Sequence, residues 1–171
     1  LLIAEFGSER RVPVPIELTP DNLINAVIAS EDNGFFEHPG IELAGIVRAA
    51  MSNVTSSGSL QGASTITQQV ARNFFLSSEQ TYTRKIKEIL LALRLEQNLS
   101  KNEILELYLN KIYLGQRAYG FGAASEIYYG KPLADLSLAQ LAMLAGLPKA
   151  PSRDNPASNP DRAAERRTYV L

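Results

Sequence analysis

Helix-start signals recur along this chain and constrain its fold more than any other feature. The run Thr-Pro-Asp at 19–21 places an N-cap residue before a proline at the first helical position, which predicts a helix over about 20–30. A serine followed three residues later by Gln or Glu is the pattern of a capping box, and it occurs at Ser77, Ser100 and Ser137. So many helix starts predict a mainly α domain.

Between these helices the sequence predicts a short β element and several loops. The segment 10–18 alternates in polarity and is broken by prolines, which is typical of a short edge strand. A further helix is expected over 41–52. The small polar residues of 53–62 and the glycine-bounded run 115–122 predict loops that could form the walls of a cleft. The proline-rich residues 148–160 predict an irregular segment before a last helix.

Composition excludes several classes of protein. With 171 residues, of which 45% are hydrophobic, the chain is expected to fold as one domain over 1–171. A net charge of -1 argues against a nucleic-acid partner. The absence of cysteine excludes thiolate chemistry, and the single histidine, His38, excludes a multi-histidine metal site. No apolar run approaches the roughly 20 residues that cross a bilayer, and we expect the chain to be a fragment of a longer, membrane-anchored protein.

An acidic pair, Glu31 and Asp32, falls at the expected C-terminal end of the first helix. Carboxylates there oppose the helix dipole, at a cost of roughly 0.3–1 kcal/mol each. Phe35 and Phe36 follow closely, and an acid flanked by aromatic rings can be desolvated enough to serve as a general base. The alternative is a solvated helix end, with His38 bracing the turn.

A polar segment, G-A-S-T-I-T-Q-Q at 62–69, opens another helix. Ser64 and Thr65 near its N-terminus would combine hydroxyls, backbone N–H groups and the positive end of the helix dipole. Gln69 and Asn73, four residues apart, share a helical face. This stripe could bind sugar hydroxyls or a diphosphate, or it could be an ordinary N-cap with a solvated face.

A charged face follows in R-K-I-K-E at 84–88. Arg84 and Lys85 lie four and three residues before Glu88, so the three side chains share one face of a helix. They could form a cationic clamp for a phosphate, oriented by the carboxylate, or merely surface ion pairs. Apolar side chains at helical spacing predict a buried stripe on the same helix: Ile86, Ile89, Leu90 and Leu93.

Taken together, the ordered blocks resemble a known family. The motifs are E-D-N-G-F-F-E-H-P-G, G-A-S-T-I-T-Q-Q, R-K-I-K-E and I-L-E-L-Y-L-N-K-I-Y-L-G, continued by A-A-S-E-I-Y-Y-G-K at 123–131 and L-A-G-L-P-K-A-P at 144–151. They are similar to the peptidoglycan glycosyltransferase domain of class A penicillin-binding proteins, particularly the 1A type, over nearly the whole chain. The resemblance implies a lysozyme-like, two-lobed helical fold with its cleft facing the membrane.

The resemblance also implies a function and its setting. Enzymes of this family polymerise lipid II, with inversion, into β-1,4-linked glycan strands at the outer (periplasmic) face of the bacterial cytoplasmic membrane. Lipid II, the growing lipid-linked strand and the inner membrane are therefore the expected partners, and a C-terminal transpeptidase domain is expected in the full-length protein. No organic cofactor is expected, and a divalent cation (Mg or Mn) is a candidate with Asp32 as its ligand.

Site roles follow from the same resemblance, residue by residue. Glu31 matches the general base that acts on the 4-hydroxyl of the acceptor, and Glu88 matches the second essential carboxylate. Lys85 matches the lysine that holds the donor diphosphate, with Arg84 beside it. Positions that line the donor site are matched by Ser64, Gln69 and Asn73. Two departures are Gln80, where the family commonly has Arg, and Gln140, where Glu is usual.

The chemistry favours transfer over hydrolysis. Cleavage of a sugar–sugar bond must protonate a poor leaving group and therefore needs an acid as well as a base or nucleophile. A diphosphate leaves as a stable anion and needs cations instead. Two alternatives remain: a lysozyme-like muramidase with Glu31 as its acid, and a non-catalytic wall- or membrane-binding module, against which the presence of both Glu31 and Glu88 argues.

Overall fold

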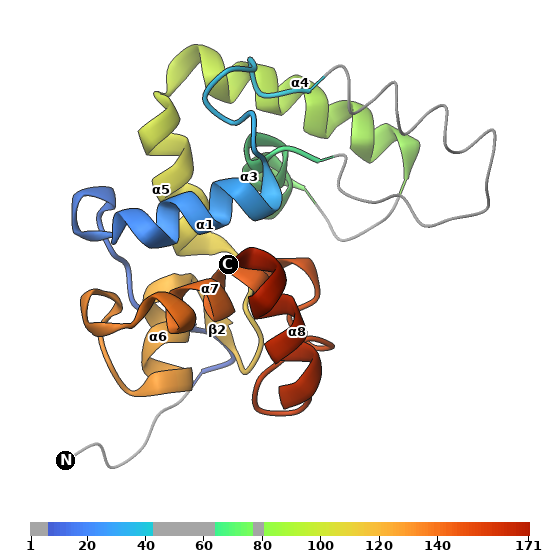
Figure 1. The fold of residues 1–171 in the computed structure, drawn as a ribbon. Helices are drawn as coiled ribbons and strands as arrows, with labels where there is room; N and C mark the ends of the chain where they lie inside the picture. Colours follow the sequence, from blue (N-terminus) through green and yellow to red (C-terminus); the bar gives the residue numbers. More distant parts are fainter. Residues whose placement is uncertain (1–6, 43–63, 77–80) are drawn as a thin grey trace. The chain divides into compact units, whose positions relative to one another are not determined.

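The structure, a computed structural model, describes residues 7–42, 64–76 and 81–171 (Figure 1). The chain divides into two compact units. The terminal unit consists of Leu1–Ser30 and Leu109–Leu171, and the central unit of Glu31–Tyr108. α5 (Lys101–Lys111) begins in the central unit and ends in the terminal one. The fold is mainly helical, as the helix-start signals predict.

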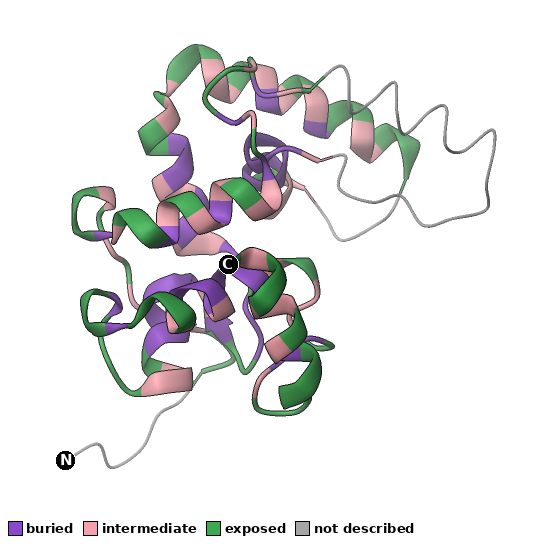
Figure 2. Cartoon of the chain, viewed as in Figure 1, coloured by how far each residue is buried: buried purple, intermediate pink, exposed green. Residues whose placement is uncertain are grey.

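Helices make up most of the terminal unit. They are α1 (Asp21–Glu31), α6 (Phe121–Tyr129), α7 (Leu138–Gly146), α8 (Pro160–Val170) and the 3-10 turns η1 (Ile16–Leu18), η2 (Leu133–Asp135) and η3 (Leu147–Lys149). The predicted capping box before α7 is confirmed, since Ser137 Oγ accepts from Gln140 N and Gln140 Oε1 accepts from Ser137 N. Figure 2 shows buried residues concentrated on α6 and α7, which form much of this unit's core. α7 packs against α8.

The strand expected over 10–18 is shorter than predicted. Only β1 (Arg10–Arg11) is a strand, and it pairs in parallel with β2 (Ala118–Tyr119). The prolines at 13 and 15 have no N–H to donate, so the ladder cannot continue through them. Instead, the Asn110 side chain accepts from Val14 N at 2.8 Å and donates to Val14 O at 2.9 Å. An amide side chain thus replaces a neighbouring strand.

The partner strand β2 lies inside the 115–122 segment, for which the sequence predicted only a turn. Gln116 and Arg117 have φ angles of 47° and 62°, and Ala118 N donates to Gly115 O at 2.7 Å. Two consecutive residues with positive φ form a type I′ turn, which favours Asn-Gly or Gly-Gly rather than long side chains. This turn delivers Ala118 to β1, since Arg10 N donates to Arg117 O at 2.9 Å.

Three helices build the described part of the central unit: α3 (Ile66–Phe75), α4 (Tyr82–Asn98) and the start of α5. Thr65 and Gln68 form a capping box at α3, and the predicted box of Ser100 with Glu103 is confirmed at α5. α4 is capped by Thr81, whose Oγ1 accepts from Arg84 N at 3.1 Å. The predicted start of this helix at Ser77 is therefore wrong, because the extended Thr81 is its N-cap. The side chains of Ser77 and Gln80, the predicted loop over 53–62 and all but the first two residues of the predicted helix over 41–52 lie outside the described residues.

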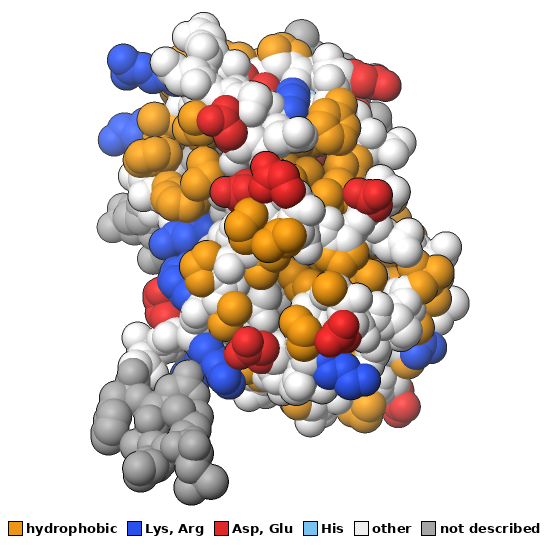
Figure 3. Space-filling view, turned by 90° about the vertical axis from the view of Figure 1, so that its left-hand side faces the viewer, with side chains coloured by type: hydrophobic (Ala, Val, Ile, Leu, Met, Phe, Trp, Pro, Cys, Tyr) orange, Lys and Arg blue, Asp and Glu red, His pale blue; other side chains and the backbone are white. Residues whose placement is uncertain are grey.

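The prediction that an apolar stripe of α4 is buried is wrong. Ile86 and Leu90 are each 61% exposed, whereas the buried residues of this helix are Glu88 and Ala92. Figure 2 accordingly shows α4 mostly exposed or intermediate. The helix turns its charged face inward because Glu88 is neutralised there by neighbouring cations, which makes burial of a carboxylate tolerable. Hydrophobic side chains also reach the surface among charged ones on the face drawn in Figure 3.

Candidate active site

Glu31, the predicted general base, ends α1 and is half-buried. Its Oε2 accepts a hydrogen bond of 3.1 Å from the side-chain Nε2 of Gln69, which is itself buried on α3. An amide donor fixes the carboxylate's orientation without removing its charge. The carboxylate is therefore held in a defined position while part of it remains accessible.

Asp32, its neighbour, is engaged on both oxygens. Oδ1 is 2.8 Å from His38 Nε2, and Oδ2 accepts from Ile66 N at 2.9 Å. Because Gly40 N donates to His38 Nδ1 at 3.1 Å, that nitrogen is the acceptor and Nε2 carries the proton donated to Asp32. Asp32 thus places a negative charge at the N-terminus of α3, where the helix dipole favours it.

These contacts limit how Asp32 could bind the predicted divalent cation. Among the described residues, no group of three or more His, Cys, Asp or Glu side chains is arranged to hold a metal ion. Asp32 would have to share oxygens already bonded to His38 and Ile66 N, so the described residues offer few of the oxygen ligands that Mg²⁺ needs. A divalent cation at Asp32 stays a prediction.

The charged face of α4 forms a compact cluster. Lys85 Nζ donates to Glu88 Oε1 at 2.5 Å, to Ser64 Oγ at 3.0 Å and to Gln68 Oε1 at 3.3 Å. Glu88 is fully buried, and its Oε2 lies 3.7 Å from Arg84 Nη1. The ammonium group uses all three of its N–H donors, so its position is tightly defined. Two cations around one carboxylate leave the cluster with a net positive charge.

Within the part of the chain that the structure describes, two buried polar atoms of this cluster have no hydrogen-bond partner: Arg84 Nε and Glu88 Oε2. Unpaired buried polar groups are costly and rare in folded proteins, and a catalytic role is one of their recognised explanations. A guanidinium that is only loosely paired, at 3.7 Å, still has donors to offer to an anion. The cluster therefore has the chemistry of a phosphate site.

Helix α3 connects the base to the cluster. Gln69 contacts Glu31, while the adjacent Gln68 contacts Lys85. Asn73, one turn after Gln69, is half-buried on the same helix. Every site residue predicted from the sequence therefore lies in the central unit, on or beside α3, on α4, or at the end of α1.

The central unit also contains a hydrogen-bonded network of residues that was not predicted from the sequence. Lys101 Nζ donates to Glu96 Oε1 and to His38 O, each at 2.7 Å, and lies 4.6 Å from the centroid of the buried Phe35 ring. Glu96 also accepts from Thr67 Oγ1 at 2.6 Å. This network fastens the segment after Glu31 to α3 and α5. Separations of 29 and 63 residues between the partners left no local signal of it.

Tyr108 is another such residue. It is 1% exposed, and its hydroxyl has no hydrogen-bond partner among the described residues. Burial raises the pKa of Tyr108 well above its ordinary value, and the negative charges of Glu31 and Asp32 raise it further. The phenol is therefore neutral and lies within electrostatic reach of the acidic pair. In the sequence, Tyr108 is part of the I-L-E-L-Y-L-N-K-I-Y-L-G motif, and no role was predicted for it.

Comparison with known proteins identifies the family of the chain. A family model described as transglycosylase matches residues 1–171. The chain belongs to the transglycosylase family. Among curated relatives, penicillin-binding protein 1A of Vibrio cholerae serotype O1 is 57% identical over 170 residues, covering 99% of this chain and 21% of that protein. Penicillin-binding protein 1A of Escherichia coli K12 is also 57% identical, over 99% of this chain and 20% of that protein.

A solved structure of a relative has a similar fold. Penicillin-binding protein 1A from Haemophilus influenzae matches with a TM-score of 0.54 and 31% identity, over 98% of this chain and 15% of that one. The lysozyme-like, mainly α fold expected from the sequence is thereby confirmed. The chain spans about a fifth of the length of the curated relatives it matches. Membership of the family also favours a glycosyl-transfer domain over a binding module.

Proposed function

We propose that this chain is the catalytic domain of a peptidoglycan glycosyltransferase that polymerises lipid II into β-1,4-linked glycan strands. The observation that carries the proposal is the link through α3 between a held carboxylate and a cationic cluster, Glu31 through Gln69 and Lys85 through Gln68. Such a pairing of one base with one anion site suits displacement of a diphosphate from a sugar.

In the proposed mechanism, Glu31 accepts the proton of the acceptor's 4-hydroxyl as that oxygen attacks the anomeric carbon of the donor. The bond between the anomeric carbon and the diphosphate oxygen breaks at the same time, so the configuration inverts. The electron pair leaves with the diphosphate, whose negative charge Lys85 and Arg84 stabilise. Gln69 orients the base, and Glu88 holds Lys85 in place rather than contacting substrate, because its side chain is only 1% exposed.

The muramidase alternative is less well supported by these contacts. A hydrolase of this kind commonly needs a second, available carboxylate across the scissile bond. Asp32 is bonded to His38 and Ile66 N, and Glu88 is buried against Lys85. Neither is placed to act as a second catalytic carboxylate, whereas the cations that a diphosphate needs are present.

The setting is part of the proposal. No described helix is both long and apolar enough to cross a membrane. The relatives are about five times longer than the part matched here, which leaves room for an anchor and for a C-terminal transpeptidase domain. We propose that the domain acts at the outer face of the cytoplasmic membrane, where lipid II and the growing strand are its partners.

The decisive experiment incubates the protein with labelled lipid II and separates the products on a gel. Glu31→Gln is expected to lower polymerisation by at least about 10²-fold, as loss of a general base does, while the protein stays folded. Glu37→Gln, at an exposed acid six residues on, is the matched control and should leave the rate unchanged. Near-normal polymerisation by Glu31→Gln, or degradation of finished glycan by the parent protein, would reject the proposal.

A further inference from the structure

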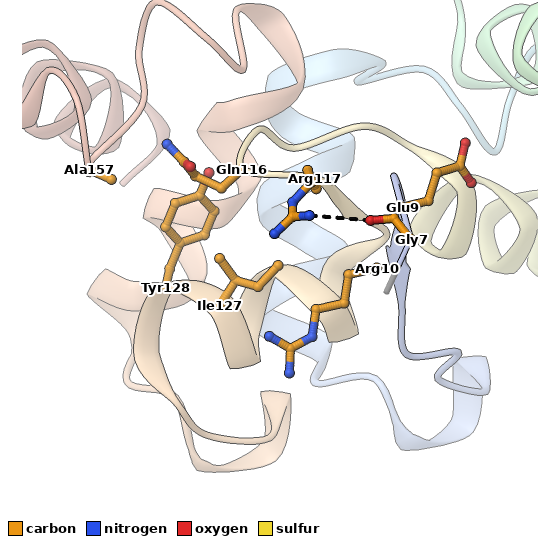
Figure 4. A pocket seen from close by; sticks show the side chains of 8 residues that line it. All are labelled: Gly7, Glu9, Arg10, Gln116, Arg117, Ile127, Tyr128 and Ala157. Carbon is orange, nitrogen blue, oxygen red and sulfur yellow. Dashed lines mark hydrogen bonds between the residues drawn. The ribbon is translucent and has the colours of Figure 1, made fainter. Parts of the chain in front are cut away.

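The terminal unit contains a cavity that the proposed reaction does not use. Its volume is about 360 Å³, within the range of small-ligand pockets, about 300–1,000 Å³. Figure 4 shows its lining, which includes the side chains of Arg10, Arg117, Gln116, Ile127 and Tyr128. All of these residues belong to the terminal unit, whereas the candidate active site lies in the central one.

The backbone that presents two of these side chains is strained. Gln116 and Arg117 occupy the central positions of the type I′ turn, with φ angles of 47° and 62°. Residues with side chains rarely adopt this conformation, and strained residues of this kind cluster at ligand sites. Gly115 permits the turn, since a Cβ there would clash with Asn155 Nδ2. The chain thus holds a guanidinium and an amide at the cavity by an unfavourable turn.

The balance of charge at the cavity favours an anion. Glu9 is neutralised by Arg11 through bonds of 2.6 and 3.0 Å, and Arg10 pairs with Glu126 at 3.5 Å. The guanidinium of Arg117 donates from Nη1 to Gly7 O at 3.2 Å and has no carboxylate partner within the described ranges. A guanidinium carries five donors, so most of those on Arg117 remain for a ligand.

The opposite wall is apolar. Ile127 and the ring of Tyr128 lie across the cavity from Arg117 (Figure 4). The Tyr128 hydroxyl donates to Leu114 O at 2.8 Å and accepts from Asn155 Nδ2 at 2.7 Å, so Tyr128 offers its ring rather than its hydroxyl. The cavity therefore combines a cationic fork, an amide and a hydrophobic wall.

We propose that this cavity binds a small ligand with a terminal carboxylate, of the size of the C-terminal end of a short peptide. The planar fork of Arg117 matches a carboxylate through paired hydrogen bonds. Small apolar side chains of the ligand pack on Ile127 and the Tyr128 ring. The site is separate from lipid II polymerisation and does not depend on it.

The test uses full-length protein and N-acetyl-alanyl-alanine as the probe, with binding followed by saturation-transfer NMR. Saturable binding is expected, and the C-terminal amide of the same probe should not bind. Arg117→Gly should weaken binding by at least about tenfold. Gln116→Gly is the matched control, because it relaxes the same turn but keeps the guanidinium, and it should weaken binding by less than about threefold.

Several outcomes would overturn the inference. They are no saturable binding, equal binding of the amide, equal effects of the two glycine variants, or binding of inorganic phosphate without binding of the peptide. The last result would assign the pocket to phosphate rather than carboxylate. Polymerisation of lipid II by Arg117→Gly is expected to stay at the parent rate, which separates failure of this inference from failure of the proposed function.

Discussion

The pair Lys85–Glu88 allows a test in which the order of stabilities is predicted from burial. Lys85 Nζ lies 2.5 Å from Glu88 Oε1; the lysine side chain is 40% exposed and the glutamate side chain 1% exposed. In Lys85→Met, Glu88 keeps a buried charge, and Arg84, at 3.7 Å, is the cation that remains beside it among the described residues. Breaking a buried pair in this way costs about 3–5 kcal/mol, and we expect the lower end because Arg84 remains.

Removal of the other partner should cost less. In Glu88→Gln, the amide oxygen can still accept from Lys85, and a lysine that is 40% exposed can be hydrated. We expect a loss of about 1–2 kcal/mol, the net worth of one charge-assisted hydrogen bond. In the double variant no buried carboxylate is left unpaired, so it should be more stable than Lys85→Met alone by about 1–2 kcal/mol.

Denaturant unfolding of the four proteins measures these differences, and for a domain of this size 1 kcal/mol corresponds to about 2–4 °C in Tm. The same series should be non-additive in polymerisation, because Glu88 acts through Lys85. A double variant that is less stable than both single variants, or rate losses that simply multiply, would refute the reasoning that burial of Glu88 serves to position Lys85.

Two further predictions concern other parts of the fold. Gly40→Ala should destabilise the protein by about 2–3 kcal/mol, because φ is 85° there and a Cβ would lie 2.8 Å from Glu96 Cγ. Gly34→Ala is the control in the same unfolding assay, since its Cβ would lie at an ordinary 3.6 Å from His38 Cδ2. Equal losses of stability in the two variants would contradict the argument. Burial alone would raise the pKa of Asp154, but hydrogen bonds from Arg153 and Arg162 hold that pKa below its ordinary value. The ionised Asp154 therefore stabilises the folded protein fully above the unfolded pKa of about 4. This stabilisation is lost as the pH falls through the lower pKa of the folded state. The stability difference between the parent and Asp154→Asn should therefore shrink in acid, and a constant difference in unfolding curves from neutral pH to pH of about 2 would count against it.

Local signals predicted the helices well because their causes are local. The capping boxes at Ser100 and Ser137 join residues three apart, so the sequence alone contains both partners. The same locality explains why the spacing of Arg84, Lys85 and Glu88 was enough to place them on one helical face. The family motifs then pointed to the same residues.

Contacts between distant segments could not be predicted in this way. Arg10 and Arg11 form a strand only because a turn more than a hundred residues later delivers Ala118 and Tyr119 beside them. The buried apolar stripe predicted on α4 was wrong for a related reason. Periodicity identified the stripe, but packing decides which face is buried, and the buried face is the one on which Glu88 contacts cations.

The sequence by itself therefore determined the helical class, the positions of most helix starts and the identity of the acidic and basic residues, since each depends on neighbours along the chain. Only the tertiary structure decided which side chains hold the site residues. Gln69 donates to Glu31, and both carboxylate oxygens of Asp32 are bonded, one to His38 and one to the first N–H of α3. Lys85 is fixed by hydrogen bonds to Ser64 and Gln68. These contacts join residues as many as 38 apart, and their geometry depends on how the helices pack.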